Sequence, residues 1–149
     1  MSSITNVGGF LTFPNKPYIF ASNNATVDVA QGNQITTFTT QFSNGITHSS
    51  GTFTVPIAGL YRIHHGVLAQ STAGTGTFGV ALRINDTQVE RISYGGEGTS
   101  EVWSMITGMT LRELSANDTI KFYSSNNTIS MYGAATSDTI GGVTIILEA

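Results

Sequence analysis

The stretch Gly51-Thr52-Phe53-Thr54-Val55-Pro56-Ile57-Ala58-Gly59-Leu60-Tyr61 decides the fold class of this 149-residue chain. Residues 52–55 are β-branched or aromatic and predict a short strand. Pro56 ends this strand because it has no amide proton to donate to a neighbour. A longer strand of similar composition is predicted at residues 60–69. The stretch is therefore interpreted as two strands joined by a tight connection.

Strand signals continue on both sides of this stretch. On one strand we expect Phe38 and Phe42 to share a face, followed by a turn at Ser43-Asn44-Gly45. Asn85-Asp86 predicts a hairpin turn. Turns recur about every ten residues, which is typical of β-sandwiches and barrels. These further strands are predicted at residues 34–42, 77–84, 87–94, 119–123 and 143–147.

One segment fits two periodicities. Val102, Met105, Ile106 and Met109 follow a helical spacing, whereas Trp103, Met105, Met109 and Leu111 alternate as in a strand. Gly108 and the β-branched neighbours disfavour a helix, so we predict a strand. No other stretch predicts a helix, and the chain is expected to be all-β.

Charge is scarce in this chain. Charged residues make up 10% and the net charge is -3, so the basic stripe that nucleic-acid binding needs is missing. Thr, Ser, Asn and Gly together supply 64 of the 149 residues, so hydroxyls and amides must form much of the surface. No run of about 18 apolar residues predicts a membrane-spanning helix, and the first residues do not resemble a secretory signal. With no Cys, the chain has no disulfide, thiolate metal site or Cys nucleophile.

The remaining titratable residues predict no catalytic or metal site, no cofactor and no enzymatic activity. His64 and His65 are adjacent on a predicted strand, so their side chains should point to opposite faces. A ring of one His from each of several subunits is the alternative. Asp86 and Asp118 each follow an Asn at a turn, where we expect them to bond the backbone. Paired carboxylates for glycoside hydrolysis are the alternative there.

Residues 1–16 differ from the rest of the chain. Phe10, Leu11 and Phe13 lie close together in this segment, and Pro14 and Pro17 follow them in the sequence. We interpret residues 1–16 as an arm that precedes a domain at residues 17–149, and the three apolar residues as contacts to a partner. The alternative is an irregular first strand that packs on its own domain.

Residues 51–61 resemble the G-x-F-x-[AV]-P-x-x-G-x-Y signature of the complement-type globular head. That family shares its jelly roll with tumour necrosis factor. In the signature, Gly51, Phe53, Pro56, Gly59 and Tyr61 are the matching core positions. Weaker similarity follows at residues 81–86, at 111–120 with Asn117 in place of a Gly, and at 142–147. The resemblance covers residues 17–149 and implies a TNF-like jelly-roll β-sandwich of about ten antiparallel strands that forms a homotrimer and binds rather than catalyses.

The chain carries neither a collagen-like stem nor the calcium ligands of some family members. A Cys-free, charge-poor trimeric jelly roll is similar to bacteriophage virion proteins. We therefore expect a capsid cement (decoration) protein on the virion surface, with the major capsid protein as partner and no nucleic-acid or membrane partner. The alternatives are the receptor-binding head of a phage fibre that recognises a host glycan, and a cellular ligand-type head. An enzyme is the least favoured class.

Overall fold

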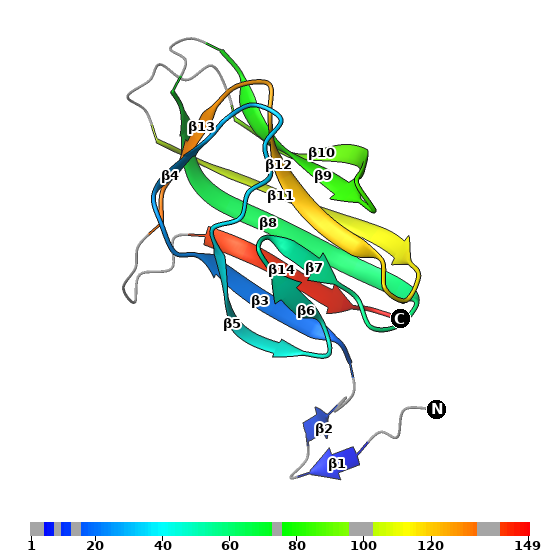
Figure 1. The fold of residues 1–149 in the computed structure, drawn as a ribbon. Helices are drawn as coiled ribbons and strands as arrows, with labels where there is room; N and C mark the ends of the chain where they lie inside the picture. Colours follow the sequence, from blue (N-terminus) through cyan, green and yellow to red (C-terminus); the bar gives the residue numbers. More distant parts are fainter. Residues whose placement is uncertain (1–4, 8–9, 13–15, 73–75, 96–102, 134–140) are drawn as a thin grey trace.

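The computed structural model describes residues 5–7, 10–12, 16–72, 76–95, 103–133 and 141–149. All regular structure in these residues is β-strand (Figure 1). None of the described residues forms a helix that could cross a membrane. The strands are β1 (Thr5–Val7), β2 (Phe10–Thr12), β3 (Tyr18–Asn23), β4 (Val27–Val29), β5 (Phe38–Asn44), β6 (Thr47–Ser49), β7 (Thr52–Thr54), β8 (Gly59–Ser71), β9 (Phe78–Ile84), β10 (Thr87–Gly95), β11 (Ser104–Leu114), β12 (Thr119–Ser125), β13 (Ile129–Met131) and β14 (Gly141–Leu147).

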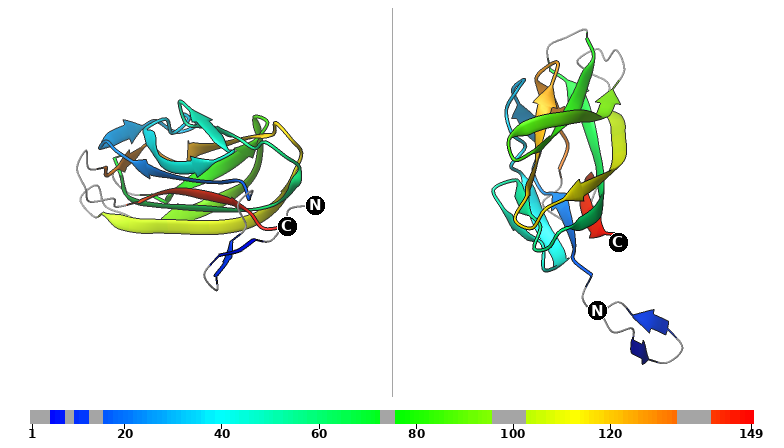
Figure 2. Two further views of the ribbon diagram at one scale, coloured as in Figure 1. Left: turned by 90° about the horizontal axis from the view of Figure 1, so that it is seen from below. Right: turned by 90° about the vertical axis from the view of Figure 1, so that its right-hand side faces the viewer.

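Two antiparallel sheets form the body of the molecule (Figure 2). The five-stranded sheet has the order β10-β9-β12-β7-β6 and is called the β9 sheet here. The seven-stranded sheet has the order β4-β13-β8-β14-β3-β5, with β11 paired to the other side of β8, and is called the β8 sheet. The strand predicted across residues 102–111 is β11, which confirms the strand interpretation of that segment. Four strands of the two large sheets lie outside the residue ranges predicted as strands, namely β3, β4, β6 and β13.

The apolar core lies between the two sheets. Phe53 of β7 and Tyr61 of β8 are fully buried, and Phe53 packs against Phe38 and Phe122 at ring-centroid distances of 5.8 and 6.1 Å. The Tyr61 hydroxyl donates a hydrogen bond of 2.9 Å to the Ile57 carbonyl, inside the connection between β7 and β8. This partly buried bond holds the connection in place after Pro56 has ended β7.

Two glycines of the same stretch allow the backbone to approach its neighbours. Gly51 has φ of 76°, and a Cβ there would lie 2.2 Å from the Ile35 carbonyl oxygen. A Cβ at Gly59 would lie 2.5 Å from Cδ1 of Leu147 and 2.7 Å from the Ala149 carbonyl oxygen. Any larger side chain at either position would push a neighbouring strand away.

Several turn predictions are confirmed. Asn85 and Asp86 both have positive φ, at 50° and 65°, and join β9 to β10 as a two-residue hairpin turn. Asn117, which stands where the family has Gly, has φ of 70°. The turn expected at residues 43–45 begins one or two residues later, because Ser43 and Asn44 still pair with β3.

The expectation that Phe38 and Phe42 share a face is wrong. Phe38 is 6% exposed and lies in the core, whereas Phe42 is 59% exposed. A β-bulge explains the difference: Phe42 pairs with Phe20, but Thr40 pairs with Ala21, so Gln41 is an extra residue on β5. The extra residue reverses the alternation and turns Phe42 outward. The strand also begins at Phe38 instead of residue 34, since Gln34 forms only an isolated bridge to Tyr123.

Candidate oligomer interface

The outward surface of the β8 sheet carries the large apolar side chains with the highest exposed fractions among the described residues, and we call it the β8 face. Antiparallel pairing places Phe42, Phe20, Thr144, His64 and Met109 side by side, one from each of β5, β3, β14, β8 and β11. Met109 is 61% exposed, and the rings of Phe20 and Phe42 lie 5.2 Å apart. This row therefore runs across five strands and contains no Lys, Arg, Asp or Glu.

Neighbouring positions extend the apolar surface. Tyr18, Ile146, Arg62 and Leu111 form the next row, and the guanidinium of Arg62 pairs with Glu148 at 2.7 Å between Nε and Oε1. The row therefore exposes apolar side chains beside a neutralised charge. Contiguous exposed apolar surface of this kind marks an interaction site in soluble proteins.

A hollow of about 350 Å³ lies in the middle of the β8 face. It exists because Gly66 of β8 and Gly142 of β14 pair with each other and have no side chains to fill the space. Its rim includes Met105, whose flexible thioether side chain can adapt its shape to a partner. The side chains around it are Phe20, His64, Met105, Thr107 and Thr144.

His64 and His65 point to opposite faces, as the sequence predicts. His64 is exposed on the β8 face, and His65 is completely buried between the sheets. The His65 ring stacks on Phe122 at 5.2 Å, Ser93 Oγ lies 3.3 Å from its Nδ1, and its Nε2 has no partner among the described residues. Burial, with a smaller contribution from His64, lowers the pKa of His65 to about 3. His65 is therefore neutral in the folded protein at ordinary pH.

This burial predicts a specific loss of stability in acid. Above about pH 6.5 His65 is neutral in both the folded and the unfolded chain, so it adds no pH dependence. Below that pH His65 binds a proton in the unfolded chain but stays neutral in the folded chain. The free energy of unfolding therefore falls with pH down to about pH 3. Between pH 7 and pH 5 we expect His65 to contribute a loss of about 2 kcal/mol in the free energy of unfolding.

Urea unfolding at several pH values measures this loss. The matched variant His65→Gln cannot titrate, so its stability should fall less than that of the unaltered protein over the same range. Equal pH dependence in the two proteins would mean that His65 is not the group responsible.

The carboxylate of Asp118 bonds the backbone of its turn, as expected. Its Oδ2 accepts a hydrogen bond of 2.8 Å from the Ser115 amide, and its Oδ1 accepts one of 2.7 Å from the Asn85 side chain. The same expectation for Asp86 is wrong: Asp86 lies in the turn, but its Oδ1 pairs with the side chain of Lys121 on β12, at 2.6 Å from Nζ. Within the described ranges, no three His, Asp or Glu side chains gather in a group that could hold a metal ion.

The N-terminal segment forms a separate element. β1 and β2 pair with each other as a two-stranded sheet that is not part of either large sheet (Figures 1 and 2). Phe10 and Leu11 belong to β2, and Phe13 lies outside the described residues. The boundary at residue 16 and the contact role of Phe10, Leu11 and Phe13 remain predictions.

Comparison with known proteins finds solved structures that share the fold of this chain. No protein-family model matches the chain, and no curated protein matches it. Murine APRIL at pH 5.0 is 9% identical with a TM-score of 0.69, covering 89% of this chain and 99% of that chain. Eiger TNF from S. frugiperda is 10% identical with a TM-score of 0.67, covering 90% and 92%. The globular domain of zebrafish complement 1qA is 14% identical with a TM-score of 0.61, covering 88% and 94%.

These similarities confirm the fold class expected from residues 51–61. The chain has an all-β, TNF-like jelly-roll fold. At this level of identity the similarity extends to the fold alone.

Proposed function

We propose that the protein is a homotrimer that attaches to the outer surface of a bacteriophage capsid as a cement protein. In this proposal the subunits associate through the β8 face. The observation that carries the proposal is the division of the molecule into an exposed apolar sheet face and a paired N-terminal segment outside both sheets. The first would hold the trimer together, and the second would contact the major capsid protein.

The trimer is supported by the chemistry of the β8 face. Met105, Met109, Leu111 and Phe42 are each more than half exposed. The first three belong to β11 and Phe42 belongs to β5, with β8, β14 and β3 between these two strands of the same sheet. Removing one apolar side chain of this size fully from water is favourable by a transfer free energy of about 1.5–3 kcal/mol. In a closed ring, neighbouring subunits cover such a face on every subunit. No exposed face is then left to which a further subunit could bind.

The attachment is supported by the N-terminal segment. Three copies of β1 and β2 in one trimer would contact three neighbouring sites on a capsid, so weak individual contacts add up by avidity. The scarcity of charge fits a partner recognised through apolar and hydrogen-bonding contacts. A binding role rather than an enzymatic one agrees with the carboxylate contacts, in which Asp118 bonds a turn amide and Asp86 pairs with Lys121.

Deleting residues 1–13 tests the attachment. The truncated chain should remain a folded trimer, because β1 and β2 contribute no strand to either sheet. Added to particles that lack the protein, it should bind at background level after sedimentation, whereas the full chain should bind in proportion to the capsid subunits. Normal occupancy by the truncated chain would contradict the attachment role. Unfolding of the truncated chain would show instead that the segment is part of the domain.

A further inference from the structure

A second hollow lies on the opposite side of the molecule, on the outward surface of the β9 sheet. We call it the β9 hollow. Val80, Leu82 and Phe122 point into the core, so the alternate residues of β9 and β12 point outward. The hollow has a volume of about 180 Å³ and is lined in part by Arg83, Gln88, Arg91, Tyr123, Ser125 and Asn126.

Sheet register explains why a hollow forms there. Ala81 of β9 lies between Tyr123 of β12 and Arg91 of β10. Gly79, two residues earlier, lies between Ser125 and Tyr94. The central strand thus contributes two small residues, Gly79 and Ala81, between the longer side chains of Arg91, Tyr94 and Tyr123 on the flanking strands. The result is a shallow floor with polar walls.

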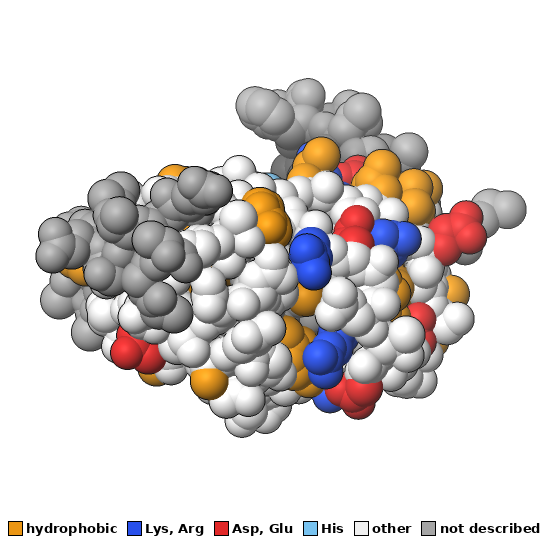
Figure 3. All heavy atoms as spheres, turned by 90° about the horizontal axis from the view of Figure 1, so that it is seen from above, with side chains coloured by type: hydrophobic (Ala, Val, Ile, Leu, Met, Phe, Trp, Pro, Cys, Tyr) orange, Lys and Arg blue, Asp and Glu red, His pale blue; other side chains and the backbone are white. Residues whose placement is uncertain are grey.

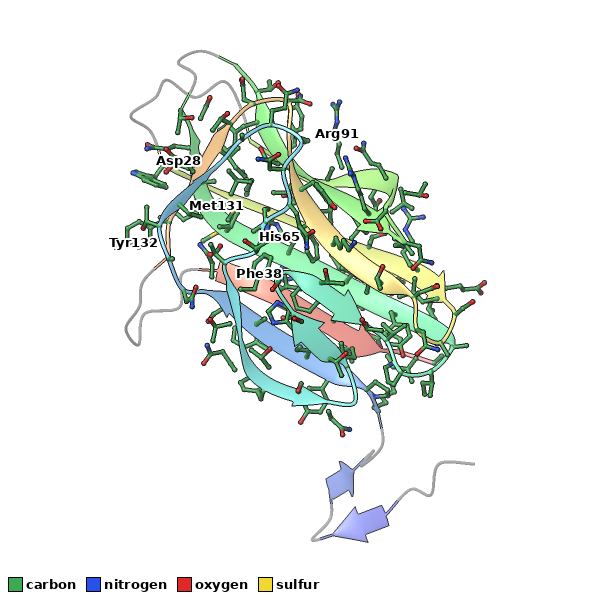
Figure 4. All side chains as sticks on the ribbon, in the orientation of Figure 1. Asp28, Phe38, His65, Arg91, Met131 and Tyr132 are labelled. Atoms are coloured by element: carbon green, nitrogen blue, oxygen red, sulfur yellow. The ribbon has the colours of Figure 1, made fainter. Side chains whose placement is uncertain are left out.

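Two arginines line this hollow without a carboxylate partner among the described residues. Arg91 is exposed and projects away from the ribbon (Figure 4). Arg83 places its guanidinium carbon 3.8 Å from the centre of the Tyr123 ring, which holds the group in one orientation. Its Nε is buried and has no hydrogen-bond partner. Both positive charges are therefore available to an anion.

Two acidic side chains of the β9–β10 hairpin are already paired with basic ones. Asp86 pairs with Lys121 at 2.6 Å, and Glu90 pairs with Arg112 at 3.0 Å. On the face shown in Figure 3, basic side chains lie near the middle, with acidic side chains directly beside some of them and uncharged surface around these groups. In a chain with so few charges, two unpaired arginines at one hollow provide a local positive potential that favours an anion.

The other side chains that line the β9 hollow indicate which groups a ligand would carry besides its anionic group. Gln88 is paired with Arg83 across the β9–β10 ladder. Ser125 Oγ is buried without a partner, and the Asn126 side chain donates to Tyr94 Oη at 3.1 Å. These amides and hydroxyls match the hydroxyl groups of a sugar. Since Arg83 already covers the Tyr123 ring, that ring is not free to stack on a nucleobase.

We propose that the β9 hollow binds an acidic monosaccharide unit, with the guanidinium groups of Arg83 and Arg91 holding its carboxylate. Arginine is suited to this because its planar fork matches the two oxygens of a carboxylate. Gln88, Ser125 and Asn126 would bond the sugar hydroxyls. The hollow and the β8 face lie on different sheets, so a trimer formed through the β8 face leaves the hollow open. This binding does not depend on the proposed capsid role.

The test is a titration of the full-length ¹⁵N-labelled protein with methyl glucuronide, followed by amide chemical shifts. Saturable shifts are expected at β9, β10 and β12, with the largest around Arg91 and Ser125. The neutral methyl glucoside and inorganic phosphate serve as separate probes. The account expects no saturable shift with the glucoside, and weaker binding of phosphate, which lacks the hydroxyls of the ring.

Variants then assign the binding to the arginines. Arg91→Gln is on the surface and should leave the fold intact, and Arg83→Gln is the second variant. Each should weaken methyl glucuronide binding by about tenfold or more, since a hydrogen bond to a charged group is lost. Lys16→Gln removes the same charge outside the hollow and should bind as the unaltered protein does.

Three results would overturn the proposal. The first is no saturable shift with methyl glucuronide. The second is equal binding of the glucuronide and the glucoside, or of the glucuronide and phosphate. The third is equal weakening by Lys16→Gln and Arg91→Gln, which would indicate general attraction by net charge. None of these results bears on attachment to a capsid, so the two proposals fail separately.

Discussion

Replacement of Met109 by lysine is expected to convert the trimer into folded monomers. Met109 is the β11 member of the row across the β8 face and pairs directly with His64. A lysine there places a positive charge beside His64 and two residue pairs away from Arg62, with no carboxylate opposite it on β8. Burying an unpaired charge costs several kcal/mol, so association should weaken by at least about two orders of magnitude.

Val89→Lys is the matched control for this result. Val89 is also an exposed apolar residue, at 38%, but it belongs to β10 of the other sheet. This variant should remain a trimer at the concentration where Met109→Lys sediments as a monomer, and both should keep the β-sheet circular dichroism spectrum. A trimer in the Met109→Lys protein would show that the β8 face is not the interface.

Phe53→Ala is expected to cause the largest loss of stability within one subunit. Phe53 is fully buried and contacts Phe38, Phe122 and the stacked His48 ring, whose centroid lies 4.5 Å away. Removing the ring leaves a cavity that these three neighbours, held by their own strands, cannot close. The free energy of unfolding should fall by about 3–5 kcal/mol.

Ile57→Ala provides the comparison for this loss. Ile57 lies in the same stretch but is 47% exposed, and the variant keeps the carbonyl that accepts the Tyr61 hydroxyl bond. It should change the free energy of unfolding by less than about 1 kcal/mol, within the range of surface substitutions. If denaturant unfolding gave a similarly small loss for Phe53→Ala, residue 53 would not occupy the core position that residues 51–61 imply.

The strands were predictable where local sequence determines them. β8, β9, β10 and β12 follow from β-branched and aromatic runs, and the hairpin after β9 follows from Asn85-Asp86. The two-strand stretch around Pro56 also marks the fold, because the buried Phe53 and Tyr61 and the close approach at Gly59 constrain which residues fit. Short-range patterns of this kind are independent of the rest of the chain.

The surfaces were not predictable, because they depend on which strands become neighbours. Phe20 and Phe42 lie 22 positions apart and meet only through the β3–β5 pairing, in which the bulge at Gln41 also reverses the exposure of Phe42. One feature of the sequence did indicate the apolar surface, namely the apolar residues on both faces of β11. Ile106 is buried in the core, while Met105 and Met109 are exposed. That pattern indicates a strand covered on both sides.

The β9 hollow depends on long-range register in the same way. Arg91 and Tyr123 flank Ala81 only because β10 and β12 pair with opposite edges of β9. Two bulges in the β9–β10 pairing set which residues of β10 face outward there. The sequence alone therefore shows six scattered basic residues, and the fold brings two of them to one hollow.

Sedimentation equilibrium of the unaltered protein at micromolar concentration measures whether other copies of the same chain cover the exposed β8 face. We expect a single species of three times the 15.7 kDa chain mass. A species of 15.7 kDa that persists over this concentration range would contradict this expectation.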